Sequence, residues 1–188
     1  MGLSNSSLDI KHIPVMLQEA TRLCSFKKNS IYLDCTFGGG SYSRKILSKK
    51  NTKVIALDRD EFVNKFANEL KKEYPNRFEF HIEKFSNIDK VVKNTLFDAV
   101  IFDLGLSNFQ LKYSDRGFSF KSKNKLNMNM GLSSESLENI LNNFSEKNLS
   151  KIIKFFGEEK DASRIARNIT KFRKKEKIIF VNQLVKII

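Results

Sequence analysis

Metal-ligating and thiol side chains are scarce in this sequence, which contains only two cysteines and two histidines. Two cysteines exclude a disulfide-stapled scaffold and a multi-cysteine zinc module. The histidines, His12 and His81, form no metal-ligand spacing with each other or with the cysteines, so we expect no metal site. Because no histidine is close to either in sequence, we expect Cys24 and Cys35 to be buried thiols rather than nucleophiles.

Long apolar runs are also missing, and none approaches the ~18–20 residues that a membrane-spanning helix needs. Residues 1–10 have neither the basic start nor the apolar stretch of a secretory signal peptide. We therefore expect a cytoplasmic protein without a membrane partner.

Negative charge is in the minority, with 21 aspartates and glutamates against 34 lysines and arginines, a net charge of +13. Residues 151–188 alone contain 11 basic and four acidic side chains. Such a surplus favours a polyanionic partner, most simply nucleic acid. The alternative is a lysine-rich composition that only keeps the chain soluble. A hydrophobic content of 40% excludes a disordered chain.

Short apolar runs alternate with longer amphipathic ones in the first part of the chain. The runs predict strands at 31–35, 53–58, 78–83 and 97–104, and helices at 42–50, 60–72 and 88–94. This alternation predicts an α/β fold with a parallel sheet and right-handed crossovers. Residues 105–125 have no clear period and predict a long functional loop.

The second part of the chain is helical by pattern. Ser133 or Ser134 is expected to cap one helix, Ser145 the next, and Gly157 to end it. A further helix near 162–172 has an apolar stripe, and the last helix continues to Ile188. We expect two regions, a partial α/β core at 1–125 and a helical basic region at 126–188. Four strands leave a sheet edge open, which predicts an incomplete fold able to self-associate.

A glycine-rich turn follows the first strand, and an acidic residue follows the second. The turn spans residues 34–43, and Asp58 lies 20 residues after Gly38, the offset at which an acid reaches ribose hydroxyls in nucleotide-binding folds. A dinucleotide fingerprint would place its third glycine at Ser43, and no Gly-Lys-Ser/Thr of a P-loop follows. The combination favours an adenosine ligand without a pyrophosphate, namely S-adenosylmethionine. The alternative is a plain glycine turn followed by a surface aspartate.

The fourth strand leads into Asp103 and the long loop. Ligands of open parallel sheets lie beyond the carboxyl ends of the strands, so Asp103 is expected to face the ligand. The loop contains one arginine among aromatic and acidic residues, a composition that suits stacking on an unpaired base: Tyr113, Asp115, Arg116, Phe118 and Phe120. For Phe118 and Phe120, anchoring the loop to the core is an equal alternative.

Six segments, in order and at matching spacing, resemble the ribosomal RNA small-subunit methyltransferase H family, also called MraW. They lie at residues 12–16, 34–40, 58–60, 102–105, 115–120 and 157–159, and the resemblance covers residues 11–188. It implies a class I (Rossmann-like) core that transfers methyl from S-adenosylmethionine to the exocyclic N4 amine of a cytidine in 16S rRNA. It also implies binding to small-subunit rRNA or the assembled small ribosomal subunit. The matching cofactor-binding positions are Gly38, Gly40, Ser41, Tyr42, Asp58, Phe85, Asp103 and Gln110.

Four departures from the family pattern stand out. The family usually has Gly-Gly-His where this chain has Gly-Ser-Tyr at 40–42. It has Ser-Ser-Pro where this chain has Ser-Asn-Phe at 107–109. It has Leu-Asp-Met-Arg-Met where this chain has Leu-Asn-Met-Asn-Met at 126–130, so Asn127 and Asn129 replace an acid and a base. The family also continues beyond this length with further strands. The missing strands and the changes at Asn127 and Asn129 support a rival hypothesis, a truncated non-catalytic homologue that retains partial cofactor or RNA binding. The intact glycine loop, Asp58 and Asp103 oppose it.

The expected chemistry is in-line attack of a cytidine amine on a sulfonium methyl group. We expect Asp103 to accept a hydrogen bond from the amine, although the resemblance assigns it to the cofactor. An NAD-dependent oxidoreductase is disfavoured by Ser43 and by the lack of a proton-relay candidate. For RNA, we expect contacts from Arg116 and from one helix face carrying Arg164, Arg167, Lys171 and Lys174. A solvated helix face without a partner is the alternative.

Overall fold

The computed structural model describes residues 14–107, 110–111, 116–133 and 135–188. Contacts divide the chain into two compact units, residues 1–105 and 106–188, and each is described by itself. Six residues that the sequence analysis names lie outside the described residues: His12, Asn108, Phe109, Tyr113, Asp115 and Ser134.

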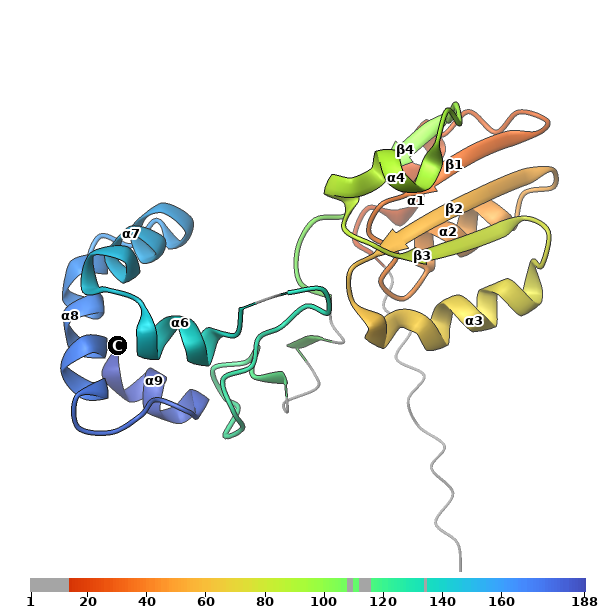
Figure 1. Cartoon of the computed structure of the whole chain (residues 1–188). Helices are drawn as coiled ribbons and strands as arrows, with labels where there is room; N and C mark the ends of the chain where they lie inside the picture. The colour runs from red at the N-terminus through yellow and green to blue at the C-terminus, as the bar shows by residue number, and fades with distance from the viewer. Residues whose placement is uncertain (1–13, 108–109, 112–115, 134) are drawn as a thin grey trace, which may run out of the picture. The chain divides into compact units, whose positions relative to one another are not determined.

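The first unit contains a parallel four-stranded sheet, as predicted (Figure 1). Its strands are β1 (Ser30–Asp34), β2 (Thr52–Asp58), β3 (Phe78–Ile82) and β4 (Ala99–Ile101), in the order β3-β2-β1-β4. Asp34 pairs in register with Ala56 of β2 and with Ile101 of β4. The carboxyl ends of these strands therefore meet at one edge, which is where the candidate site is built.

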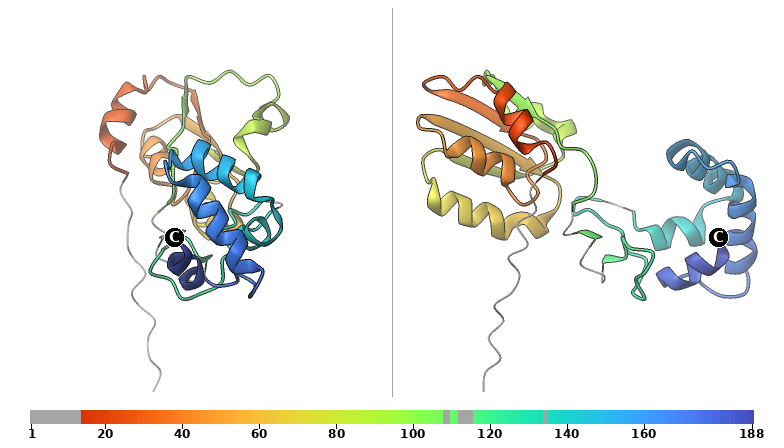
Figure 2. Two further views of the ribbon diagram at one scale, coloured as in Figure 1. Left: turned by 90° about the vertical axis from the view of Figure 1, so that its left-hand side faces the viewer. Right: turned by 180° about the vertical axis from the view of Figure 1, so that it is seen from behind.

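Both faces of the sheet are covered because its side chains alternate between two apolar clusters. Tyr32, Val54 and Phe78 point to the face that packs against α1 (Leu17–Leu23), α2 (Ser41–Leu47) and α3 (Asn64–Glu73). Leu33 and Leu57 point to the other face, which α4 (Ile88–Val92) covers. Seen from behind in Figure 2, the red, orange and yellow helices α1 to α3 lie over the first face.

Three details of the first unit differ from the prediction. The last strand is only three residues long, and α1 is a helix that the apolar pattern did not indicate. The helix predicted at 60–72 begins with a short 3₁₀ turn, η1 (Glu61–Val63), in which Asp60 accepts a capping hydrogen bond from the Phe62 amide. A second 3₁₀ turn, η2 (Phe85–Asn87), follows β3. Among the described residues β4 pairs only with β1, so its other edge is unpaired there.

The second unit is helical, as predicted, with α6 (Leu137–Asn143), α7 (Glu146–Gly157), α8 (Ala162–Arg173) and α9 (Val181–Ile187). Its core combines Leu126 with apolar residues of all four helices, including Leu141, Leu149, Ile169 and Ile187. Helices α7 and α8 pack antiparallel, since the start of α7 meets the end of α8 at the Glu146–Thr170 hydrogen bond of 3.0 Å.

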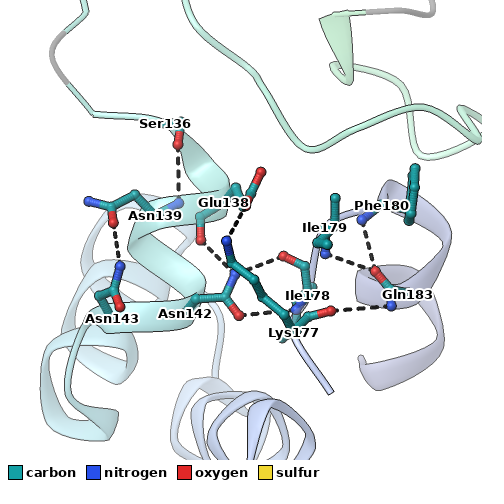
Figure 3. A network of polar contacts seen from close by, with 10 residues as sticks. All are labelled: Ser136, Glu138, Asn139, Asn142, Asn143, Lys177, Ile178, Ile179, Phe180 and Gln183. Atoms are coloured by element: carbon teal, nitrogen blue, oxygen red, sulfur yellow. Dashed lines mark hydrogen bonds and ion pairs between the residues drawn. The ribbon is translucent and has the colours of Figure 1, made fainter.

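Polar side chains fix the segment between α8 and α9 (Figure 3). Asn142 donates to the carbonyl of Ile178 at 2.8 Å and accepts from its amide at 3.0 Å. Gln183 Oε1 accepts from the amides of Ile179 and Phe180, both at 2.8 Å. The start of α9 is therefore tied to the chain that precedes it, and this chain is tied to α6.

Helix ends in the second unit depart from the predicted residues. Ser136, rather than Ser133 or Ser134, caps α6 by accepting from the Asn139 amide at 3.1 Å. Ser145 caps α7 as predicted. Gly157 is still helical, and Glu158, with φ of 51°, is the left-handed residue that ends α7.

The boundary between the units lies before the predicted one. Residues of the long loop are held within the second unit, because Arg116 donates to the Asn129 carbonyl at 2.5 Å and Lys125 bridges to Phe180. The functional division into a cofactor-binding core and a basic region stays a prediction. None of the helices in the described part of the chain is both long and apolar enough to span a membrane.

Candidate functional site

The glycine-rich turn joins β1 to α2 beside the end of β2. The Phe37 amide donates to the Leu57 carbonyl at 2.9 Å, which holds the turn against β2. Gly38 and Gly40 have positive φ angles of 52° and 76°, and α2 begins at the half-buried Ser41. The two glycines thus allow a tight reversal of the backbone in a conformation that other residues rarely adopt.

Asp58 lies at the end of β2 and holds the turn through its carboxylate. Oδ2 accepts from the Gly38 amide at 2.8 Å, and Oδ1 accepts from the Asp60 amide at 2.9 Å. Burial raises the pKa of Asp58, and the Gly38 hydrogen bond partly offsets that rise. Each carboxylate oxygen has a second lone pair, so both can still accept a ligand hydroxyl.

Asp34 is a second carboxylate beneath the turn, and it is almost completely buried. Its Oδ2 accepts from the Ser43 hydroxyl at 2.6 Å, and its Oδ1 accepts from the Thr36 amide at 3.3 Å. Burial raises the pKa of Asp34 to about 6, while the Ser43 and Thr36 hydrogen bonds oppose the rise. Asp34 therefore fastens both ends of the turn from inside.

This raised pKa predicts a pH-dependent stability. Between its ordinary pKa of 3.8 and about 6, the folded chain keeps a proton on Asp34 that the unfolded chain has lost. The contribution of Asp34 to the free energy of unfolding is therefore fully present below pH 3.8. It falls as the pH rises through about 6, by up to about 3 kcal/mol in all. We expect the wild type to lose unfolding free energy relative to Asp34→Asn between about pH 4 and about pH 7, as measured by urea titrations. A difference that stays constant with pH would contradict this assignment.

Asp103 is exposed two residues after the end of β4. Its backbone amide donates to the Thr36 hydroxyl at 2.7 Å, so the segment after β4 is tied to the glycine-rich turn. Near it, the exposed rings of Phe85 and Phe102 meet edge to face with centroids 5.6 Å apart. The carboxyl edge of the sheet thus combines two accessible aromatic rings with the carboxylates of Asp58 and Asp103.

These residues fit an adenosine ligand. A Cβ at Gly38 would meet only the Thr36 carbonyl, at 3.9 Å, so a ligand has room to approach that backbone. Asp58 offers acceptors for ribose hydroxyls, and the Phe85 and Phe102 rings offer an apolar surface for a base. The side chain of Tyr42, by contrast, is buried in the core, which leaves only its backbone for the predicted contact.

Gln110 and Arg116 belong to the second unit and have structural partners there. Gln110 is buried, and its Oε1 accepts from the Ser107 amide at 2.9 Å. Arg116 lies 5.4 Å from the Phe118 ring centroid and bonds the Asn129 carbonyl. Phe118 is half-buried, whereas Phe120 is exposed, so only Phe118 is placed as an anchor of the loop.

The two amides that replace charged family residues differ in their surroundings. Asn127 is exposed, and its Oδ1 accepts from the Asn129 amide at 3.3 Å. The Oδ1 atom of Asn129 is buried without a hydrogen-bond partner among the described residues. Neither side chain carries a charge that could orient a substrate.

The four basic residues predicted for RNA binding on the helix face are exposed, as expected: Arg164, Arg167 and Lys171 in α8, and Lys174 directly after it. Two of them face carboxylates, because Arg164 pairs with Asp161 at 2.7 Å and Arg167 lies 3.9 Å from Glu146. Their charges are therefore partly neutralised within the chain. Sequence spacing alone did not indicate the second pair, since Glu146 belongs to another helix.

Four residues of the candidate site were missed as functional candidates: Asp34, Thr36, Ser43 and Phe102. Thr36 and Ser43 act through hydrogen bonds to Asp103 and Asp34. A signal was present for Thr36 and Ser43, which lie within the glycine-rich turn, but their partners depend on the folded backbone. Phe102 is placed by its contact with Phe85, which is distant in sequence.

Metal-binding and thiol chemistry find no support in the described part of the chain. No three histidine, cysteine, aspartate or glutamate side chains gather there in a way that could hold a metal ion. Cys24 and Cys35 are buried, as predicted, and burial raises the pKa of the Cys35 thiol to about 11.

Comparison with known proteins agrees with this geometry. Ribosomal RNA small subunit methyltransferase H of Rickettsia akari (strain Hartford) is 41% identical over 177 residues, which are 94% of this chain and 58% of that protein. The protein of the same name from Neorickettsia sennetsu (strain ATCC VR-367 / Miyayama) is 37% identical over 190 residues, 100% of this chain and 64% of that protein. The chain thus spans less than two thirds of the length of these relatives. The profile of the MraW methylase family matches residues 9–188, and the chain belongs to that family.

Proposed function

We propose that this chain binds S-adenosylmethionine and takes part in methylation of the N4 amine of a cytidine in small-subunit rRNA. The observation that carries the proposal is the carboxyl edge of the sheet, where the open turn at Gly38 lies beside Asp58, Phe85 and Asp103 in a member of a methylase family. The names of the relatives support the rRNA substrate. A cytoplasmic location and the small ribosomal subunit as partner follow from that substrate.

The proposed binding mode assigns each group of residues to one part of the cofactor. Asp58 accepts hydrogen bonds from the ribose hydroxyls, and Phe85 contacts the adenine. The backbone at Gly38, Gly40, Ser41 and Tyr42 lies along the methionine portion, and Asp34 and Ser43 keep that backbone in place from below. The cofactor contact expected of Gln110 stays a prediction.

The reaction then requires the protein mainly to position and orient. Bound S-adenosylmethionine supplies an electrophilic methyl group on a sulfonium. The cytidine amine is a poor nucleophile because its lone pair is delocalised into the ring. Asp103, exposed and held through its backbone by Thr36, accepts a hydrogen bond from the amine and thereby orients the nitrogen toward the methyl group. A separation of ~3–3.5 Å between the two reacting atoms is what this positioning has to achieve.

The proposal is tested by calorimetric titration of the purified chain with S-adenosylmethionine, S-adenosylhomocysteine and NADH. Binding of the two adenosyl compounds without NADH binding is the expected result. Binding of NADH instead would favour the hypothesis of an NAD-dependent oxidoreductase. Binding of S-adenosylmethionine without methyl transfer would favour the non-catalytic homologue, which the charge-free Asn127 and Asn129 also support.

We further propose self-association through the unpaired edge of β4. Val100 and Phe102, in and just after this strand, are about half exposed, at 47% and 50%. An unpaired edge with exposed apolar side chains tends to pair with another chain. Sedimentation velocity over a concentration series is expected to show dimers that Val100→Lys abolishes. A monomer at all concentrations would contradict this proposal.

A further inference from the structure

A small basic pocket lies between α8 and α9 in the second unit. Its volume is about 270 Å³, and it is lined by Asn168, Lys171, Phe172, Lys175, Lys186 and Ile187. Three of these six residues are lysines, and none is acidic. Pockets for drug-sized ligands span ~300–1,000 Å³, so this pocket suits a fragment the size of one nucleotide.

The lysines of this pocket have no counter-charge among the described residues, unlike three basic residues nearby. Arg164, Arg167 and Lys177 each lie within 4.0 Å of a carboxylate. No ion pair to Lys171, Lys175 or Lys186 is found within the described residues. The positive charge of the three pocket lysines is therefore available to an external anion, whereas that of Arg164 and Arg167 on α8 is partly neutralised.

The pocket is also built by fixed elements. Asn168 of α8 donates to the carbonyl of Ile187 in α9 at 3.3 Å, which ties the two helices together. Gln183, one turn before Lys186, is held by the Ile179 and Phe180 amides (Figure 3). Arg173 donates to the Leu141 carbonyl at 2.7 Å and fixes the end of α8. Ile187 is buried and Phe172 half-buried, so the lining has an apolar part next to the lysines.

We propose that this pocket binds one nucleotide of a single-stranded RNA segment, with the phosphate at Lys171, Lys175 and Lys186 and the base against Phe172. Lysines suit phosphate as point charges, and an aromatic ring gives a base a surface on which to stack. Phosphate contacts of this kind position an RNA without reading its sequence. The inference rests on the proposed RNA substrate, but it concerns a site separate from the cofactor edge.

The test compares two double variants that remove the same charge. Lys175→Gln with Lys186→Gln should weaken binding to a short single-stranded small-subunit rRNA oligonucleotide by about tenfold. It should also flatten the slope of log affinity against log salt by up to ~0.7, since the one phosphate contact proposed here contributes ~0.7 on a single strand. The control, Lys151→Gln with Lys154→Gln, changes two exposed lysines of α7 outside the pocket and should have less effect. Equal losses in both variants would overturn the site.

Two further arms separate the nucleotide from other anions. A polyphosphate of matching charge, which has no base, should bind the wild-type chain more weakly than the oligonucleotide. Equal affinity for polyphosphate, or for a poly-glutamate peptide, would overturn the nucleotide assignment. S-adenosylmethionine affinity and the circular dichroism spectrum should be the same in both variants and wild type. Loss of RNA binding together with a change in S-adenosylmethionine affinity or in the circular dichroism spectrum would mean that the variant had misfolded. Lys175→Glu alone would then be measured in place of the double variant. We expect it to weaken RNA binding more steeply, and unchanged RNA binding would contradict the site.

Discussion

Replacing Asp58 with alanine is expected to weaken S-adenosylmethionine binding by ~1–3 kcal/mol, measured by isothermal titration calorimetry. The carboxylate is the proposed acceptor for the ribose hydroxyls, and it also holds the Gly38 and Asp60 amides at 2.8 and 2.9 Å. The variant therefore loses ligand hydrogen bonds and the fixed position of the turn together.

Asp98 supplies a matched control for this variant. It is an exposed carboxylate just before β4, and it accepts a hydrogen bond from the Ile31 amide at 2.9 Å. Asp98→Ala removes the same charge and a comparable backbone hydrogen bond at the opposite, amino end of the strands. We expect it to leave the cofactor affinity unchanged. Equal affinity of wild type and Asp58→Ala for S-adenosylmethionine would contradict the assignment of Asp58 to the cofactor site.

Gly40→Ala is expected to lower the free energy of unfolding by ~2–4 kcal/mol, from a left-handed backbone and from overpacking. Gly40 has φ of 76°, and an added Cβ would lie 2.8 Å from two ring carbons of Phe37. The ring cannot move away easily, because Phe37 is buried and packs against Phe78 and Phe80 with centroids 5.6 and 5.0 Å apart. Urea denaturation measures the change.

Gly38→Ala separates the two causes. Gly38 also has a positive φ, of 52°, but its added Cβ would meet only the Thr36 carbonyl at 3.9 Å. We expect its unfolding free energy to fall by ~1–2 kcal/mol, the backbone cost alone. Both variants should bind S-adenosylmethionine more weakly. Equal destabilisation by the two substitutions would contradict the role given to the Phe37 ring.

Helices and strands were predictable from the sequence where their apolar residues are the ones that are buried in the core. The strands β1 and β2 were found almost at the observed residues because their side chains alternate between two covered faces. Helix α1 was missed because its buried residue is Thr21, whose hydroxyl donates to the Leu17 carbonyl, while Leu23 is exposed. Several serines precede α6, and only the folded chain selects Ser136 as the cap.

The candidate site was predictable where it depends on local motifs. Gly38, Gly40, Asp58 and Asp103 follow from the glycine-rich turn and from the ends of the strands. The rest depends on contacts between distant segments, as in the bond from Asp103 to Thr36 and the contact of Phe85 with Phe102. The pairing of Arg167 with Glu146 and the approach of Lys171 and Lys175 to Lys186 likewise need the packed helices.

The most direct test of the proposed activity is methyl transfer from isotopically labelled S-adenosylmethionine to small-subunit rRNA, both free and assembled into small subunits. We expect label on the N4 amine of a cytidine, located by mass spectrometry of the digested RNA, and loss of that label with Asp58→Ala but not with Asp98→Ala. Bound S-adenosylmethionine with no label on either form of the RNA would contradict the proposed enzymatic activity.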